Sequence, residues 1–179
     1  MANNLLGTGK STGMFYVAPK GTALPATPGT TPGADWKLVG DISEDGITLT
    51  LPSGDVIKNW AKEPVRKVNT ETGKVVGAII ETSKTVFETL FGAENVDYEA
   101  ATSSHGNISS VELSPDVAAA PAAYLFLAKD GDVLTMYGTT NGLIEDIADV
   151  AVSPDGIVSW NVTIGGTWKI AHDDGQVTS

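Results

Sequence analysis

Apolar and polar residues alternate in several short stretches of the chain, most clearly between Trp36 and Phe91. From residue 47 to residue 51, isoleucine and leucine alternate with threonine, a period of two that is typical of a strand with one buried face. An extended segment that turns at Gly46 is expected just before it, and others at 56–60, 65–68 and 75–80. The last of these is apolar on both faces, which predicts that its own core covers one side and the helix or a partner covers the other.

One short helix is expected at residues 84–92. Thr85 and Glu88 have the spacing of a capping box, and Ser83 is the alternative N-cap. Apolar residues at 86, 87, 90 and 91 share one side of a helix, and Gly92 stands where a left-handed C-terminal residue is favoured. The pattern therefore predicts an amphipathic helix that covers one flank of a sheet.

The rest of the chain predicts more strands. They are expected at 13–18, 107–113, 124–128, 133–137, 143–152 and 158–164, with residues 140–142 as a separator and a proline-glycine turn at 153–156. The alanine-rich stretch 117–123 is bracketed too closely by Pro115 and Pro121 to form a stable helix. Many short strands with a single helix favour a mainly β fold, a sandwich or barrel.

Three segments lack such patterns within what we expect to be one domain, residues 1–179. They are an N-terminal arm at 1–11, a loop rich in proline and glycine at 19–35, and a polar C-terminal tail at 165–179. The loop is either a disordered excursion or a segment that becomes ordered against a neighbouring subunit, because long structureless loops tend to be functional or mobile.

Composition narrows the classes of function. The chain has no cysteine and a formal net charge of −11, so disulfides are excluded and a surface that seeks nucleic acid or anionic membrane is disfavoured. No apolar run approaches the roughly 20 residues needed to span a bilayer, and the first residues lack the pattern of a signal peptide. These features predict a soluble protein that is not secreted.

No motif predicts catalysis, a metal or a cofactor. The sequence from Gly9 to Thr12 (GKST) lacks the earlier glycine of a phosphate-binding loop and the strand and helix around it. His105 and His172 stand without the spaced partners of a metal site. Carboxylates occur as sequence neighbours, which point to opposite faces of a strand. We therefore expect no enzyme.

Four stretches, in this order and spacing, resemble the major tail tube proteins of long-tailed, siphovirus-like bacteriophages. They are WKLVGDISEDGI from residue 36, EPVRKVNTETGKVVGAIIET from 63, VFETLFGAENV from 86 and VAVSPDGIVSWNVT from 150. The resemblance implies a tail-tube-type β-sandwich or barrel with one flanking helix and extended arms and loops. It also implies a long hairpin within residues 56–82.

The same resemblance implies a structural role and a set of partners. Subunits of that family form hexameric rings that stack into the tube through which genomic DNA is ejected. The expected partners are copies of the chain itself, a tape measure protein and tail terminator or tail-tip proteins, with no membrane. DNA would pass without specific binding, and the protein would be assembled in the host bacterial cytoplasm and located in the virion tail. Ring closure would also remove the exposed edges of an open sheet.

Candidate subunit-interface residues follow from that resemblance: Trp36, Trp60, Arg66, Glu71 and Trp168. An aromatic at a loop boundary, such as Trp36 or Trp168, anchors a segment either on its own domain or on a neighbour. The alternative function is a β-sandwich binding or virion decoration module that recognises a glycan or a surface. Such a module would need an exposed aromatic platform.

Overall fold

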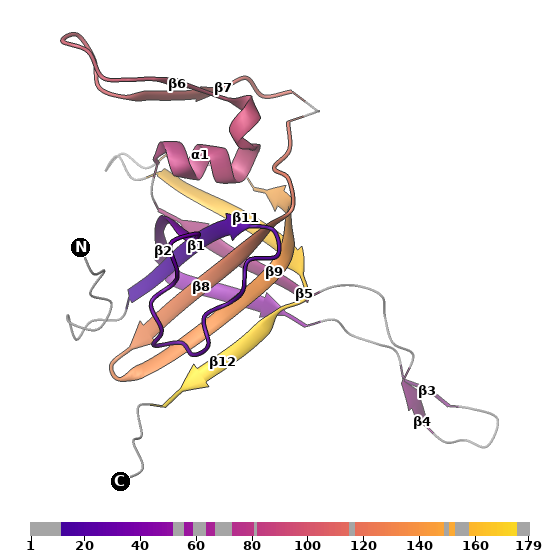
Figure 1. Ribbon diagram of the computed structural model, residues 1–179. Helices are drawn as coiled ribbons and strands as arrows, with labels where there is room; N and C mark the ends of the chain where they lie inside the picture. Colours follow the sequence, from indigo (N-terminus) through magenta and orange to yellow (C-terminus); the bar gives the residue numbers. More distant parts are fainter. Residues whose placement is uncertain are drawn as a thin grey trace.

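The computed structural model describes residues 12–51, 56–58, 64–66, 73–80, 82–114, 117–148, 151–152 and 158–174 (Figure 1). Its strands are β1 Thr12–Pro19, β2 Lys37–Thr50, β3 Val56–Lys58, β4 Pro64–Arg66, β5 Gly73–Ile79, β6 Val96–Glu99, β7 Ile108–Val111, β8 Ala122–Asp130, β9 Val133–Ile147, β10 Ala151–Val152, β11 Val158–Gly166 and β12 Lys169–Asp173. One α-helix lies within these ranges, α1 Lys84–Phe91, followed by the short 3₁₀ helix η1 Ala93–Asn95. The prediction of a mainly β fold with one helix is confirmed.

The largest sheet closes into a barrel. Its strand order is β10-β11-β5-β2-β1-β8-β9-β12, and β11 also pairs with β9, which closes the six strands from β11 to β9 and leaves β10 and β12 as flanking strands. All these pairings are antiparallel, and the closing contact runs from Val162 opposite Ile147 to Gly166 opposite Gly142. We expected the edge strands of an open sheet to pair with neighbouring copies of the chain. This is wrong for the barrel, because most of its strands have a strand of the same chain on each side.

Two long strands bend around the corners of the barrel. The first part of β2 pairs with β1 and its last part pairs with β5, with an irregularity between Ile42 and Ile47. Gly46, expected in a turn, lies within this irregularity at φ 71°. β9 pairs with β8 as far as Gly142 and with β11 beyond it. Residues 140–142, expected as a separator, are therefore part of a continuous strand.

The barrel interior is an aromatic and aliphatic core. Phe15 stacks on Phe126 with ring centres 4.5 Å apart, and the ring centre of Tyr124 lies 5.9 Å from that of Phe15. α1 extends this core, because Phe91 and the half-buried Phe87 both form T-shaped contacts with Trp160. The amphipathic helix expected at residues 84–92 therefore packs on the sheet with its apolar side, as predicted.

The outer face of β1, β8 and β9 carries a second core. Tyr16, Leu125, Leu127 and Met136 are buried there together with Trp36. The loop between β1 and β2 supplies this cover, and Leu24 packs into the same cluster. Successive residues of a strand point to opposite faces, so β8 is buried on both faces, one in each core.

Of the two N-cap residues expected for helix α1, Thr85 and Ser83, the structure has Ser83. Ser83 is the N-cap, and its Oγ accepts a hydrogen bond from the backbone N–H of Val86 at 3.4 Å. The helix ends at Phe91, and Gly92 follows at φ 86° with its N–H donating to the carbonyl of Glu88 at 3.0 Å. A glycine is favoured at this φ because it has no Cβ.

Three expectations for the connections are corrected. The long hairpin expected within 56–82 is not formed as such, because β4 pairs with β3 while β5 pairs with β2 and β11. Residues 169–173, expected in a polar tail, form β12 along β9. β6, which the sequence analysis did not identify, pairs with β7 in a separate ribbon. The arm at residues 1–11 lies outside the described residues.

Candidate assembly surfaces

Trp36 anchors the loop of residues 20–36 on its own domain. Its side chain is 8% exposed and belongs to the second core. The indole N–H donates to the carbonyl of Ala23 at 3.3 Å, which ties the loop back to the start of β2. The loop is therefore ordered against its own barrel, and a contact of Trp36 with a neighbouring subunit stays a prediction.

Trp168 lies in the short connection between β11 and β12. Its indole N–H donates to the carbonyl of Gly73 at 3.2 Å, and its ring centre is 6.0 Å from that of Phe126. The side chain is half-buried. Trp168 thus closes one end of the barrel while part of its surface stays open to solvent or to a neighbour.

The other predicted interface residues belong to the β3–β4 region. Arg66 is the last residue of β4 and pairs with Val56 of β3, although its side chain is not described. Trp60 and Glu71 lie outside the described residues. Figure 1 shows the β3–β4 ribbon projecting away from the barrel, and contacts of these three residues with a neighbouring subunit stay predictions.

β12 offers an open strand edge. It pairs with β9 along one side, from Lys169 opposite Gly138 to Asp173 opposite Leu134, and no described strand pairs with its other side. Ile170 on this strand is 49% exposed. Free backbone N–H and C=O groups along such an edge can accept a strand from another chain. The sequence pattern did not indicate this surface, because residues 169–173 were expected in a polar tail.

The outward face of β5 is a second open surface. Val75 and Ile79 point into the barrel, whereas Val76 is 38% exposed and Ile80, just after the strand, is 40% exposed. The prediction that both faces of this segment are covered is confirmed for the inner face, and on the outer face only Ala78 is buried. The remaining apolar residues are available to a partner.

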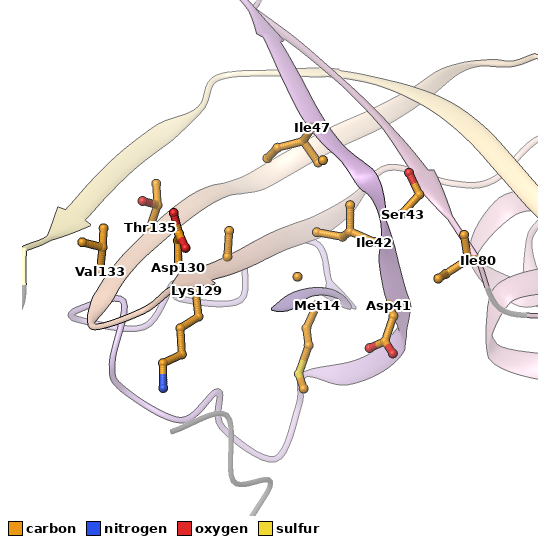
Figure 2. A pocket seen from close by; sticks show the side chains of 13 residues that line it. Met14, Asp41, Ile42, Ser43, Ile47, Ile80, Lys129, Asp130, Val133 and Thr135 are labelled. Carbon is orange, nitrogen blue, oxygen red and sulfur yellow. The ribbon is translucent and has the colours of Figure 1, made fainter. Parts of the chain in front are cut away.

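One apolar pocket lies beside the irregular part of β2, where β2 changes its pairing partner from β1 to β5 (Figure 2). Its volume is about 600 Å³, and it lies between the start of β1, the irregular part of β2 and the turn from β8 to β9. Met14, Ile42 and Ile47 supply much of its lining, with Asp41 and Lys129 at the side. Polar side chains such as Ser43, Asp130 and Thr135 also line the pocket.

The ionisable side chains of the described residues form no metal-binding cluster. No three of histidine, aspartate or glutamate come together there in a way that could hold a metal ion. His105 Nε2 lies 3.1 Å from Glu99 Oε1, and His172 Nδ1 lies 3.1 Å from the hydroxyl of Thr135. Burial raises the pKa of Tyr124 to about 12, which keeps this phenol protonated inside the core.

Comparison with known proteins identifies the family. No helix within the described ranges combines the length and apolar character needed to cross a membrane. No curated protein matches the sequence. The family model described as phage tail tube protein matches residues 3–168, a range that includes α1, both ribbons and every strand of the largest sheet except β12. The chain therefore belongs to the phage tail tube protein family and has a structural role in the virion tail.

Proposed function

We propose that this protein assembles into hexameric rings that stack as the tail tube of a siphovirus-like phage, the conduit for genome ejection into the host. The observation that carries the proposal is the family match over residues 3–168. It extends beyond the barrel to the β3–β4 and β6–β7 ribbons.

The geometry supports assembly of subunits that are already folded. Since the barrel closes within one chain, each subunit can fold before it meets another. The open edge of β12 and the apolar outer residues Val76 and Ile80 lie on different strands of the barrel. A contact between two different surfaces of identical subunits is head-to-tail, and such contacts close into a ring when the rotation allows.

Charge supports the role of a conduit. The chain carries a formal net charge of −11, and a wall with an excess of carboxylates repels a passing polyanion. DNA would then pass without specific binding. In this proposal the protein catalyses no reaction and takes no cofactor.

The remaining partners follow from this role. We expect a tape measure protein inside the tube and a tail terminator or tail-tip proteins at its ends, with assembly in the host bacterial cytoplasm. Trp60, Arg66 and Glu71 remain candidate contacts between subunits, together with the open part of Trp168.

The test is negative-stain electron microscopy of the purified protein over a range of concentrations, with and without tail-tip complexes as seeds. The proposal expects rings or tubes with a central hole. Particles that stay small and globular at high concentration, even with seeds, would refute it. Size-exclusion chromatography with light scattering checks the mass of the ring independently.

The alternative of a glycan or surface binding module has less support. Trp36 and Trp160 are buried and Trp168 is half-buried, so the described tryptophans form no exposed aromatic platform. Monomers that bind a glycan array and never form rings would favour this alternative.

A further inference from the structure

The loop between β1 and β2, residues 20–36, lies across the outer face of the barrel in an irregular conformation (Figure 1). We call this loop the strap. Beneath it are the buried side chains of the second core, which come from β1, β8 and β9: Tyr16, Leu125, Leu127 and Met136. A helix or a second sheet usually covers an apolar sheet face. Here an irregular segment keeps that face from water.

The strap has a specific seat on β9. Across the outer face, Tyr16 of β1 lies opposite Leu125 of β8, and Leu125 lies opposite Gly138 of β9. Gly138 has no side chain to complete this row, and Leu24 of the strap occupies the place instead. A Cβ added at Gly138 would lie 2.6 Å from Cδ2 of Leu24. Leu24 therefore packs directly on the backbone of β9, a close approach that a glycine in a strand permits.

The polar contacts of the strap are mostly its own. Within the described residues, one backbone hydrogen bond joins it to β9, from the N–H of Gly21 to the carbonyl of Thr140 at 2.7 Å. The indole of Trp36 bonds to Ala23 inside the strap. Other backbone hydrogen bonds close turns in the same segment, from Thr22 to Pro19, from Thr30 to Thr27 and from Trp36 to Gly33. The hold of the strap on the barrel therefore depends strongly on apolar insertion, with Leu24 at its centre.

We propose that the strap opens and closes as a unit over the intact barrel, with Leu24 on Gly138 as its latch. Opening uncovers the apolar outer face of β8 and β9, including Met136, while the strand pairings of the barrel stay in place. Proteins open locally in cooperative segments at free energies below that of global unfolding. The strap can do so because its turns are internal, whereas β8 has a strand on each side. This inference does not depend on assembly into a tube.

Oxidation of Met136 by hydrogen peroxide reports the opening. Met136 is fully buried beneath the strap, and Met14, half-buried at the edge of the same core, shows that the peroxide is active. Peroxide transfers one oxygen atom to an accessible thioether, which gives the sulfoxide and water. The measured quantity is the rate of sulfoxide formation at each methionine in the full-length protein, followed by mass spectrometry of its peptides.

Two substitutions weaken the latch from its two sides. Leu24→Ala removes the inserted side chain, and Gly138→Ala places a methyl group where that side chain lies. Each should raise the rate of Met136 oxidation by about tenfold or more, because the open population rises. The double variant should oxidise no faster than the faster single variant, since the added methyl group no longer displaces a leucine. Gly33→Ala, in the strap with nothing within 4 Å of the added atom, is the matched control and should behave like wild type.

Amide hydrogen exchange separates opening of the strap from unfolding of the barrel. The N–H of Gly21, which joins the strap to β9, should exchange faster than that of Phe126 in β8, and the latch variants should speed up only the former. Met136 oxidation that stays at the wild-type rate in Leu24→Ala overturns the inference. So does a variant that accelerates Met136 oxidation and Phe126 exchange by the same factor, because the strap would then open only with the barrel. If Gly138→Ala does not fold, Leu24→Ala decides alone.

Discussion

The barrel and the β6–β7 ribbon use the same kind of strand pairing for different purposes. In the barrel, β8 is buried on both faces and has a strand on each side. In the ribbon, one face rests on α1 and the other carries exposed carboxylates. Stability is concentrated where apolar surface is removed from water, so the barrel should contribute most of it and the exposed face of the ribbon little. Substitutions in the two regions should therefore differ in their effect on stability.

The largest expected difference concerns apolar side chains. Phe126→Ala should lower the free energy of unfolding by about 3–5 kcal/mol, because it removes a ring that stacks on Phe15 in a closed core. Ile108→Ala should cost less than about 0.5 kcal/mol, since that side chain is largely exposed. Urea titrations followed by tryptophan fluorescence measure both. Equal losses in the two variants would contradict the division into a stable barrel and an exposed ribbon face.

Alkaline pH should weaken the barrel through Tyr124. The pKa of this buried phenol is raised to about 12 in the folded chain, against about 10 when unfolded. Between these values the unfolded chain loses the proton while the folded chain keeps it. The stabilisation is complete below about pH 10 and falls by about 2–3 kcal/mol as pH rises to about 12. Tyr124→Phe should show a shallower loss over this window in urea titrations, and parallel curves would refute the assignment.

A methyl group should be tolerated in the ribbon and not at the barrel corner. At Gly142 an added Cβ would lie 2.7 Å from Cδ2 of Tyr124 and 2.8 Å from Cγ2 of Thr139. Gly142→Ala should therefore cost about 1–3 kcal/mol through overpacking. At Gly106, between β6 and β7, nothing lies within 4 Å of the added atom. Gly106→Ala should be close to neutral in thermal unfolding, and a larger loss there than at Gly142 would reverse the comparison.

The junction between the two regions should respond least. Ser83→Ala removes the N-cap of α1, the helix on which the ribbon rests, and should cost about 1 kcal/mol. The matched change Ser110→Ala, on the exposed face of β7, should leave the melting temperature within about one degree. If both variants melt alike, the Ser83 hydroxyl adds nothing to the helix.

Local patterns predicted the elements that depend on neighbouring residues. The start of α1, its apolar side and its terminal glycine were all visible in the sequence, because capping and helical spacing are local. The alternation at β2 and β11 was visible for the same reason. β6 was missed because four residues that follow directly on η1 carry little periodic signal, and β12 because Lys169 and His172 made it look like a polar tail.

Pairing and closure were not visible, because they join residues far apart in the chain. The sequence around residues 70–73 has the residues of a turn, yet β5 pairs with β2 and β11. Threonine, asparagine and glycine at 140–142 look like a loop, whereas Gly142 is the place where a strand passes closely over Tyr124. For the candidate interface, the sequence allowed Trp36 to anchor the loop either on its own domain or on a neighbouring subunit. The hydrogen bond from its indole N–H to the carbonyl of Ala23 shows that it anchors the loop on its own domain.

The closed barrel has a consequence for growth of a filament. A subunit whose main sheet is complete by itself can accumulate as a finished building block, so polymerisation need not wait for refolding at the growing end. The rate of elongation then depends on collision and alignment of rigid bodies. In the proposed tube, such a subunit would suit initiation by a template, because folded monomers would need only a nucleus that presents the first complementary layer.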